Sequence, residues 1–197
     1  MPRGRRVNSS GEKSKKLLLE KAIELFSTHG YHQTKISDIV KAANLTQPTF
    51  YLYFQSKESL FNDLNEEFQN KLMEIMDDGL LQSSQQTKNI KARLFENFKN
   101  IFNYFVENPN LTKIGFYECE GSSIIKNKMV YALSSALERE QSNFTVLDSV
   151  GATILAESIL GSVERLTLTT LLTKQCEPEK LASHIINIYF TEQLELV

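Results

Sequence analysis

A short segment, Thr46 to Tyr53 (TQPTFYLY), carries a high density of hydroxyl and amide groups. The side chains in it that donate or accept hydrogen bonds are those of Thr46, Gln47, Thr49, Tyr51 and Tyr53. These groups are too polar for a helix that is buried on all sides. The segment is therefore better suited to hydrogen bonding with a partner outside the chain.

Catalytic chemistry has little support in the sequence. The three histidines are His29, His32 and His184. There is no Gly-x-Ser-x-Gly motif, phosphate-binding glycine loop or metal-binding histidine pair. We therefore expect no enzyme activity, no cofactor and no metal site.

The composition is typical of a globular protein, with 197 residues of which 41% are apolar and 10% aromatic. No apolar run approaches the roughly eighteen residues that a membrane span needs, and no apolar segment follows the basic start as in a signal peptide. Cys119 and Cys176 are too few for a disulfide framework. These features predict a soluble, cytoplasmic protein with no membrane partner.

The formal net charge of −2 conceals an asymmetry along the chain. Residues 1–61 contain ten lysines and arginines but five acidic residues, whereas the remainder contains twelve basic and nineteen acidic residues. Such a basic block suggests a polyanionic partner for that end of the chain. The alternative is a solvated tail on an ordinary domain, and residues 1–14 are predicted to form a basic, flexible arm.

Helical spacing of apolar residues predicts the elements that position the polar segment. A first helix runs from Lys15 to His29, and Gly30 supplies its stop. Thr34 is the predicted N-cap of a second helix, which ends at Asn44 because asparagine tolerates the left-handed conformation.

A third, short helix is predicted to begin after Thr46 as N-cap, with Pro48 acceptable in its first turn. Phe50 and Phe54 are spaced to anchor it, and Ser56 caps a long fourth helix. Two helices joined by a short turn after a stabilising helix form a helix-turn-helix, whose second helix enters the DNA major groove with its N-terminal residues at the base edges. The polar segment is thus predicted to meet bases and phosphates.

Roughly residues 15–64 resemble the DNA-binding domain of the TetR family of bacterial repressors. The residues that carry the resemblance are Gly30-Tyr31, Thr34, Asp38-Ile39, Ala42-Ala43, Thr49-Phe50-Tyr51, Tyr53-Phe54 and Ser56-Lys57-Glu58-Ser59-Leu60. The resemblance implies an all-helical homodimer whose variable C-terminal domain binds a small ligand. The sequence departs from the family pattern at Asn44 and Pro48, where glycine is more usual.

The resemblance also implies roles for individual residues. Thr34 and Lys35 are expected to contact phosphate at the head of the second helix, where the helix dipole favours an anion. Tyr51, Tyr53 and Lys57 are expected to make further phosphate contacts. The alternatives are that the two tyrosines pack against the first helix and that the lysine is merely solvated.

Base reading is expected from Gln47 and Thr49, with Pro48 packing on a thymine methyl group. Thr46 is expected to divide between capping and phosphate contact. The arginines of the arm either add backbone or minor-groove contacts or have no role.

The rest of the chain is predicted to be helical after a polar linker at 79–86, which gives an all-α fold of about nine helices. The expected later helices span about 90–106, 112–118, 124–141, 149–172 and 178–194. The predicted organisation is an arm (1–14), a three-helix helix-turn-helix DNA-binding domain (15–62) and a helical ligand-binding and dimerisation domain (63–197).

The last two helices are the predicted dimer interface, because the first of them is apolar around most of its circumference. The expected interface residues are Leu155, Ile159, Leu166, Ile185 and Tyr189. The resemblance implies a four-helix bundle between the two subunits. A monomeric core is the alternative.

An aromatic cavity for an unidentified small-molecule ligand is predicted among the middle helices. Its expected lining is Phe98, Phe102, Phe105, Phe116, Tyr117 and Tyr131, and the alternative for each is plain core. The acidic balance of this half suggests a cationic ligand, although surface acids give the same count. Glu157 is either a buried counter-ion or an exposed side chain.

The predicted function is that of a sequence-specific DNA-binding transcriptional regulator. We expect a homodimeric repressor that a small ligand releases from a pseudo-palindromic operator in double-stranded DNA. One alternative is a protein-interaction module with the helix-turn-helix fold, and DNA binding that weakens with salt would separate the two. Another is a redox-responsive regulator that uses Cys119 and Cys176.

Overall fold

The computed structural model describes residues 7–80, 89–119, 121–139 and 150–190. Within these ranges the chain forms nine α-helices, two π-helical turns and no β-strand, which confirms the predicted all-α fold. The described residues fall into two compact units. The first takes residues up to 68 together with 110–119, and the second takes 69–109 and the residues from 121 onward. This division after residue 68 differs from the domain boundary predicted after residue 62, and it places 110–119 in the first unit.

Helix α1 (Val7–His29) contributes a buried stripe to the first unit. The stripe consists of Leu18, Ala22 and Phe26, which recur every four residues. As predicted, Gly30 ends the helix, with a φ of 81°. The prediction of a flexible arm up to residue 14 is wrong, because the helix begins at Val7. A Cβ at Gly11 would lie 3.4 Å from the hydroxyl oxygen of Tyr53, so a tertiary neighbour supports the early turns.

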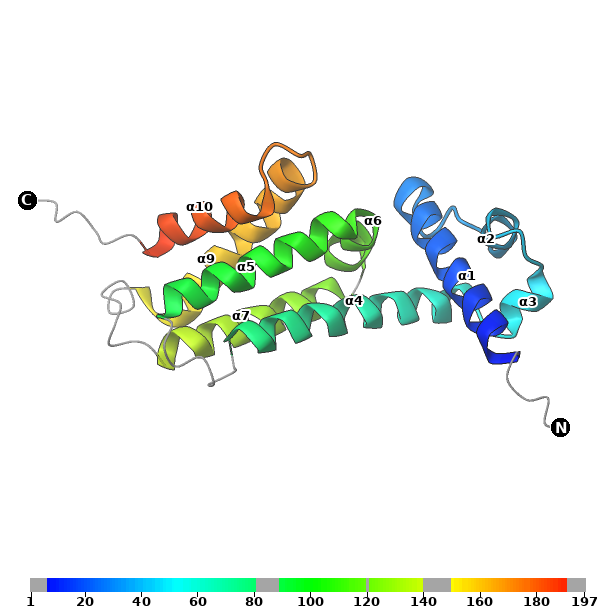
Figure 1. Ribbon diagram of the computed structural model, residues 1–197, viewed down its shortest axis with the longest axis horizontal. Coiled ribbons are helices and arrows are strands. Elements are labelled where there is room, and N and C mark those ends of the chain that lie inside the picture. The colour runs from blue at the N-terminus through cyan, green and yellow to red at the C-terminus, as the bar shows by residue number, and fades with distance from the viewer. Residues whose placement is uncertain (1–6, 81–88, 120, 140–149, 191–197) are drawn as a thin grey trace, which may run out of the picture. The chain divides into compact units, whose positions relative to one another are not determined.

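Helices α2 (Ile36–Ala42) and α3 (Gln47–Tyr51) form the predicted pair, joined by a short turn (Figure 1). Asn44 adopts a φ of 53° in that turn, as its residue type predicts. Thr46 is the N-cap of α3, also as predicted, because its Oγ1 accepts a hydrogen bond from the backbone N–H of Thr49 at 3.4 Å.

The N-cap of α2 is Lys35, which corrects the prediction of Thr34. The backbone N–H of Lys35 donates to Oδ2 of Asp38 at 3.0 Å. Thr34 lies one residue earlier, and only 2% of it is exposed. Its hydroxyl donates to the carbonyl oxygen of Gly30 at 2.9 Å, so the threonine closes the loop after α1 instead of capping α2.

Helix α4 (Lys57–Leu80) begins with the predicted cap. The N–H of Ser59 donates to Oγ of Ser56 at 3.0 Å, and the N–H of Ser56 donates to Oγ of Ser59 at 3.1 Å, so each serine satisfies the other. The buried stripe of α4 consists of Leu60, Leu64, Phe68, Leu72 and Met76. Its residues up to 68 belong to the first unit and the remainder to the second.

The helix predicted over 112–118 is divided into two parts. Helix α6 spans Pro109–Lys113, and the π-helical turn η2 spans Ile114–Glu118. Phe116 in η2 is fully buried, with its ring centroid 6.5 Å from that of Phe68. This packing explains why a segment from the middle of the sequence joins the first unit.

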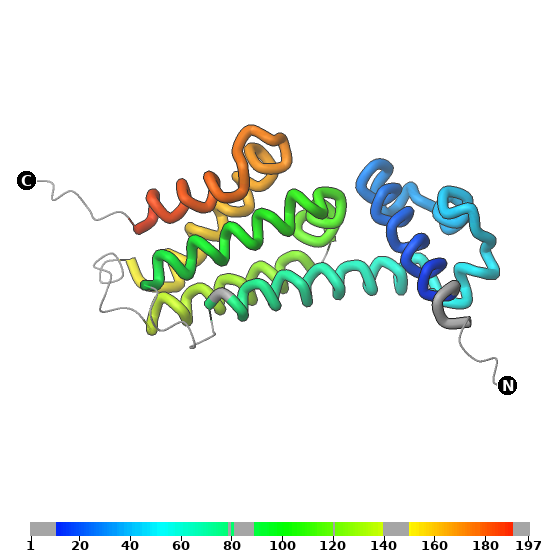
Figure 2. The backbone as a smooth tube through the Cα atoms, viewed as in Figure 1, coloured from blue at the N-terminus to red at the C-terminus, as the bar shows by residue number. Residues whose placement is uncertain are grey.

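The second unit pairs helices that are distant in sequence. Helix α5 (Ile90–Glu107) lies beside α10 (Pro178–Phe190), and helix α7 (Ser122–Arg139) lies beside α9 (Ala152–Leu166) (Figure 2). The helix predicted to continue to residue 172 changes to a π-helical turn, η4 (Thr167–Leu171), after α9. The predicted linker at 79–86 begins inside α4; its remainder, and the predicted helix ends at 141, 149 and 194, lie outside the described residues.

Polar contacts fix the pairing within the second unit. Nδ2 of Asn97 on α5 donates to the carbonyl oxygen of Ile75 on α4 at 2.8 Å. Lys126 on α7 forms an ion pair with Glu164 on α9, with 2.6 Å between Nζ and Oε1. Both contacts are partly buried. A different pairing of the helices would leave these polar groups without partners and would lower the stability of the fold.

Candidate nucleic-acid interface

The polar head of α3 is at the surface of the first unit. Thr46, Gln47 and Pro48 are exposed and Thr49 is half-buried. The hydroxyls of Thr46 and Thr49 are within hydrogen-bond distance, at 2.9 Å. Phe50, which is fully buried, holds the helix in the unit from its other side. The head thus presents an amide, a proline ring and two hydroxyls to an external partner.

The two tyrosines that follow lie in different environments. Tyr51 is 56% exposed, and its ring stands edge-on to that of Phe50 with the centroids 5.5 Å apart. Tyr53 is half-buried, and its hydroxyl lies beside Gly11 of α1. The placement of Tyr51 is compatible with a phosphate contact. The placement of Tyr53 matches the alternative of packing against the first helix.

Leu52, between the tyrosines, is a candidate contact residue that the sequence reasoning missed. It is the C-cap of α3 and is 77% exposed, which is unusual for a large apolar side chain. A leucine at that position could contact a thymine methyl group or a sugar. Its residue type alone predicts a buried side chain, so no signal in the sequence would have identified it.

The predicted phosphate contacts at the head of α2 separate into one exposed and one buried residue. Lys35 is exposed, and its ammonium is suited to an anion. The buried hydroxyl of Thr34 is engaged with the Gly30 carbonyl, so the prediction that this side chain touches phosphate is wrong. Of the two residues, Lys35 alone remains a candidate for a phosphate contact through its side chain.

Lys57 is not merely solvated, and the phosphate contact predicted for it stays a prediction. Its Nζ donates to the carbonyl oxygen of Tyr31 at 2.7 Å and to that of Thr34 at 2.9 Å. The same Nζ lies 4.2 Å from the centroid of the Tyr31 ring. The ammonium is therefore engaged within its own unit.

The aromatic residues predicted to form a ligand cavity are mostly core. Phe98, Phe102 and Phe105 are buried on α5, as in the alternative given for each of them. Phe116 belongs to the first unit, and Tyr117 beside it is half-buried. The four buried phenylalanines match the alternative of plain core, and the lining role predicted for Tyr117 stays a prediction. Tyr131 differs: it is 75% exposed and lines a groove.

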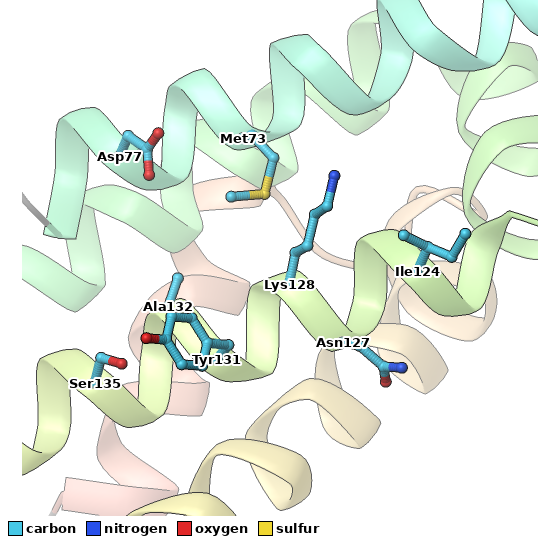
Figure 3. Close-up of a pocket in the computed structure, with 8 residues that line it drawn as sticks. All are labelled: Met73, Asp77, Ile124, Asn127, Lys128, Tyr131, Ala132 and Ser135. Atoms are coloured by element: carbon cyan, nitrogen blue, oxygen red, sulfur yellow. The ribbon is translucent and has the colours of Figure 1, made fainter.

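That groove lies between α4 and α7 and has a volume of about 540 Å³ (Figure 3). Its lining residues are Met73 and Asp77 from α4, and Ile124, Asn127, Lys128, Tyr131, Ala132 and Ser135 from α7. The lining is mainly apolar. The Lys128 side chain extends from α7 towards α4 (Figure 3). This arrangement could hold an elongated apolar molecule with a polar end.

The residues predicted for the dimer interface are mostly turned into their own unit. Leu155, Ile159 and Ile185 are buried there, so a partner subunit could not reach them and this prediction is wrong. Leu166 is half-buried. The hydroxyl of Tyr189 hydrogen-bonds to the hydroxyl of Ser162 at 2.6 Å and ties α10 to α9.

Exposed apolar residues lie on other sides of α9 and α10 and on the turn η4. Ile154 on α9, Leu168 on η4 and Ile188 on α10 are all exposed, with Ile188 69% exposed. Gly161 on α9 is exposed, and a Cβ there would have no neighbour within 4 Å. Glu157 is exposed, which decides between its two predicted environments.

Cys119 and Cys176 are both half-buried, and neither forms a disulfide. They belong to different units. Among the described residues no group of three or more histidine, cysteine, aspartate or glutamate side chains could hold a metal ion. Over the same part of the chain, no helix is both long and apolar enough to cross a membrane.

Comparison with known proteins agrees with this geometry. The model of the family described as "Bacterial regulatory proteins, tetR family" matches residues 18–64. The uncharacterized HTH-type transcriptional regulator YdgC of Bacillus subtilis (strain 168) is 35% identical over 182 residues, which cover 92% of this chain and 93% of that protein.

Two solved structures have a similar fold. A TetR-family transcriptional regulator from Bordetella parapertussis 12822 matches with a TM-score of 0.75 at 18% identity, covering 93% of this chain and 97% of that one. The regulator FadR from Bacillus subtilis, in complex with stearoyl-CoA, matches with a TM-score of 0.71 at 19% identity, covering 89% and 97%.

Proposed function

Because this chain belongs to the tetR family of bacterial regulatory proteins, we propose that it is a homodimeric repressor that a small molecule releases from operator DNA. It is a DNA-binding transcriptional regulator with a helix-turn-helix. The observation that carries the proposal is the capped, exposed head of α3, with Gln47 and Pro48 at the surface and Lys35 exposed at the head of α2.

Each exposed group has a suitable partner on DNA. The Gln47 amide can form two hydrogen bonds with adenine, and Pro48 can pack on a thymine methyl group. Lys35 and Tyr51 supply phosphate contacts, which fix the register without reading sequence. Thr46 and Thr49 combine capping with contacts to the same groove. A two-fold symmetric dimer would require a pseudo-palindromic operator with half-sites one helical turn apart.

The test is to select binding sites from a random DNA library and to measure affinity for the selected site over a range of salt concentrations. We expect a preferred, pseudo-palindromic sequence whose binding weakens as salt rises. A chain that shows no affinity for any DNA at low salt would contradict this function and would favour a protein-interaction module.

The proposed dimer interface is the exposed apolar face of α9, η4 and α10. Ile154, Gly161 and Leu168 are spaced by seven residues, so they lie close to one line along α9 and η4. Ile188 supplies an exposed apolar side chain from α10. A glycine with open space at its Cβ would allow the partner helix to approach closely.

The proposed ligand site is the groove between α4 and α7. Its apolar lining suits an elongated hydrophobic body, and Lys128 can bind an anionic end group. Since the FadR structure of similar fold contains stearoyl-CoA, acyl-CoA is the first ligand class to test. Stearoyl-CoA should release the protein from its operator, and Ser135→Trp, which fills the groove, should abolish that release. Equal release from both proteins would exclude the groove.

Induction requires the ligand and the operator to weaken each other's binding by the same factor. A coupling free energy of about 1–3 kcal/mol corresponds to a roughly 5–150-fold change in the affinity for the operator. Helix α4 supports this link, because it starts in the DNA-binding unit at Lys57 and supplies Met73 and Asp77 to the groove. Titrating stearoyl-CoA calorimetrically with and without operator tests the coupling, and equal affinities would exclude it.

A further inference from the structure

We propose that the groove between α4 and α7 selects a ligand whose two ends differ in charge, with an anionic group bound by Lys128 and a cationic group bound by Asp77. This selectivity rests on the proposed function, in which the groove is the ligand site. It adds the chemistry of the second end of the ligand. An anionic amphiphile with an apolar tail, such as an acyl-CoA, would use the contact with Lys128 alone.

The two charged side chains lie on opposite walls of the groove and at different points along it (Figure 3). Asp77 belongs to α4, where it lies on the Ser135 side of Met73 (Figure 3). Lys128 belongs to α7, and the end of its side chain lies on the Ile124 side of the same methionine (Figure 3). One end of the groove is therefore nearer to a carboxylate and the other is nearer to an ammonium.

Neither charge is neutralised by the part of the chain that the structure describes. Within that part, the side chains of Asp77 and Lys128 form no ion pair or hydrogen bond, either with each other or with another residue. Arg139, one turn after Ser135 on α7, donates from Nε to the carbonyl oxygen of Ser135 at 3.0 Å and is not part of the lining. Both groove charges can therefore pair with a bound molecule.

The surface between the two charges is mainly apolar. Met73 and Ala132 belong to it, and the ring of Tyr131 is 75% exposed there. On α7 the lining extends from Ile124 to Ser135, which is about three helical turns or 16 Å. A chain of methylene groups along this surface would bury apolar area while its two ends reached the two charges.

The carboxylate of Asp77 determines which ligands are accepted at its end of the groove. It would repel a second carboxylate on the ligand and attract an ammonium. Because Asp77 and Lys128 are both exposed, each interaction should resemble an exposed ion pair and change the affinity by roughly two- to fivefold. The groove should therefore rank ligands of one length by the charge at the end distant from Lys128.

The test uses three probes of the same length, namely dodecanoate, ω-aminododecanoate and dodecanedioate. All three carry a carboxylate for Lys128, and their other end is a methyl group, an ammonium or a second carboxylate. Affinities are measured by calorimetric titration at neutral pH and low salt, below the concentrations at which the probes aggregate. We expect ω-aminododecanoate to bind roughly two- to fivefold more tightly than dodecanoate.

Two charge-removing variants assign this preference to individual side chains. Asp77→Asn should abolish the advantage of ω-aminododecanoate and raise the affinity for dodecanedioate, because the charge is lost while the shape is kept. Lys128→Met should weaken all three probes by a similar factor, because they share the carboxylate. Both positions are exposed, so neither change should unfold the chain.

Glu107→Gln is the matched control. It changes the net charge as Asp77→Asn does, at an exposed residue of α5 outside the lining, and it should leave all three affinities unchanged.

The groove-filling variant Ser135→Trp separates the proposed selectivity from the ligand site itself. If binding of the probes is lost in this variant, they occupy the groove. Equal affinities for dodecanoate and ω-aminododecanoate, or an advantage that survives in Asp77→Asn, would then overturn the selectivity and leave the site. If Ser135→Trp binds the probes as the wild type does, the site and the selectivity are both wrong. If the wild type binds none of them, the selectivity is wrong, and release from the operator by stearoyl-CoA decides whether the groove is a ligand site.

Discussion

A Cβ atom on Gly115 would lie 2.5 Å from Cδ1 of Phe68, so η2 approaches α4 at a distance that only glycine allows. Phe68 is fully buried and has little room to move. Gly115→Ala should therefore destabilise the protein by about 1–3 kcal/mol through overpacking. Thermal unfolding should show a midpoint lowered by roughly 2–4 °C for each kcal/mol.

A double variant distinguishes this clash from a general effect of removing glycine. Phe68→Leu shortens the side chain that the new methyl group would meet. Combined with Gly115→Ala, it should cost less than the sum of the two single changes. Strict additivity would mean that the two residues do not interact as the structure shows.

The exposed face of α10 is expected to hold the dimer together. Ile188→Asp should give a folded monomer in sedimentation experiments, because the new charge remains in water in the monomer and would be buried in the dimer. Ile185→Asp is the matched control three residues away. It places a charge in the core of the unit and should unfold the chain instead. A stable Ile188→Asp dimer would place the interface elsewhere.

Removing the Gln47 amide should change which DNA sequence the protein prefers. Gln47→Ala should relax discrimination at one base position by roughly 1–3 kcal/mol if its contact is bidentate, with the salt slope retained. Binding-site selection with the variant would show the relaxed position. If its preferred sequence equals that of the wild type, Gln47 does not read a base, and Thr49 or Pro48 becomes the candidate.

The buried hydroxyl of Thr34 should contribute to stability and not directly to DNA binding. Thr34→Val leaves the part-buried Gly30 carbonyl without this donor and should cost about 1–3 kcal/mol. Thr28→Val is the control, because its hydroxyl bonds to the Glu24 carbonyl at an exposed position, and it should stay within about 0.5 kcal/mol of wild type. Chemical denaturation of both variants measures the difference, and equal losses would contradict the assigned role.

Local features were predictable because they depend on neighbours in the sequence. The left-handed turn at Asn44, the Thr46 cap and the Ser56 cap require only a residue type and the next few backbone groups. Helical periodicity likewise predicted the anchoring of α3 by Phe50 and Phe54, which are both buried. The all-α fold and the location of the helix-turn-helix follow from such signals.

The environment of each side chain was decided by residues far away in the chain. Ile185 and Ile188 have the same chemistry, yet only packing against other helices determines that one is buried and the other exposed. The partners of Lys57 within its own unit were likewise not predictable from its type and position. They are the carbonyls of Tyr31 and Thr34, more than twenty residues earlier, which accept hydrogen bonds from its ammonium. The sequence by itself determined which helices form and where they are capped, because those energies are local. The tertiary structure decided which surfaces remain for DNA, a ligand or a second subunit, because burial depends on what the fold brings together.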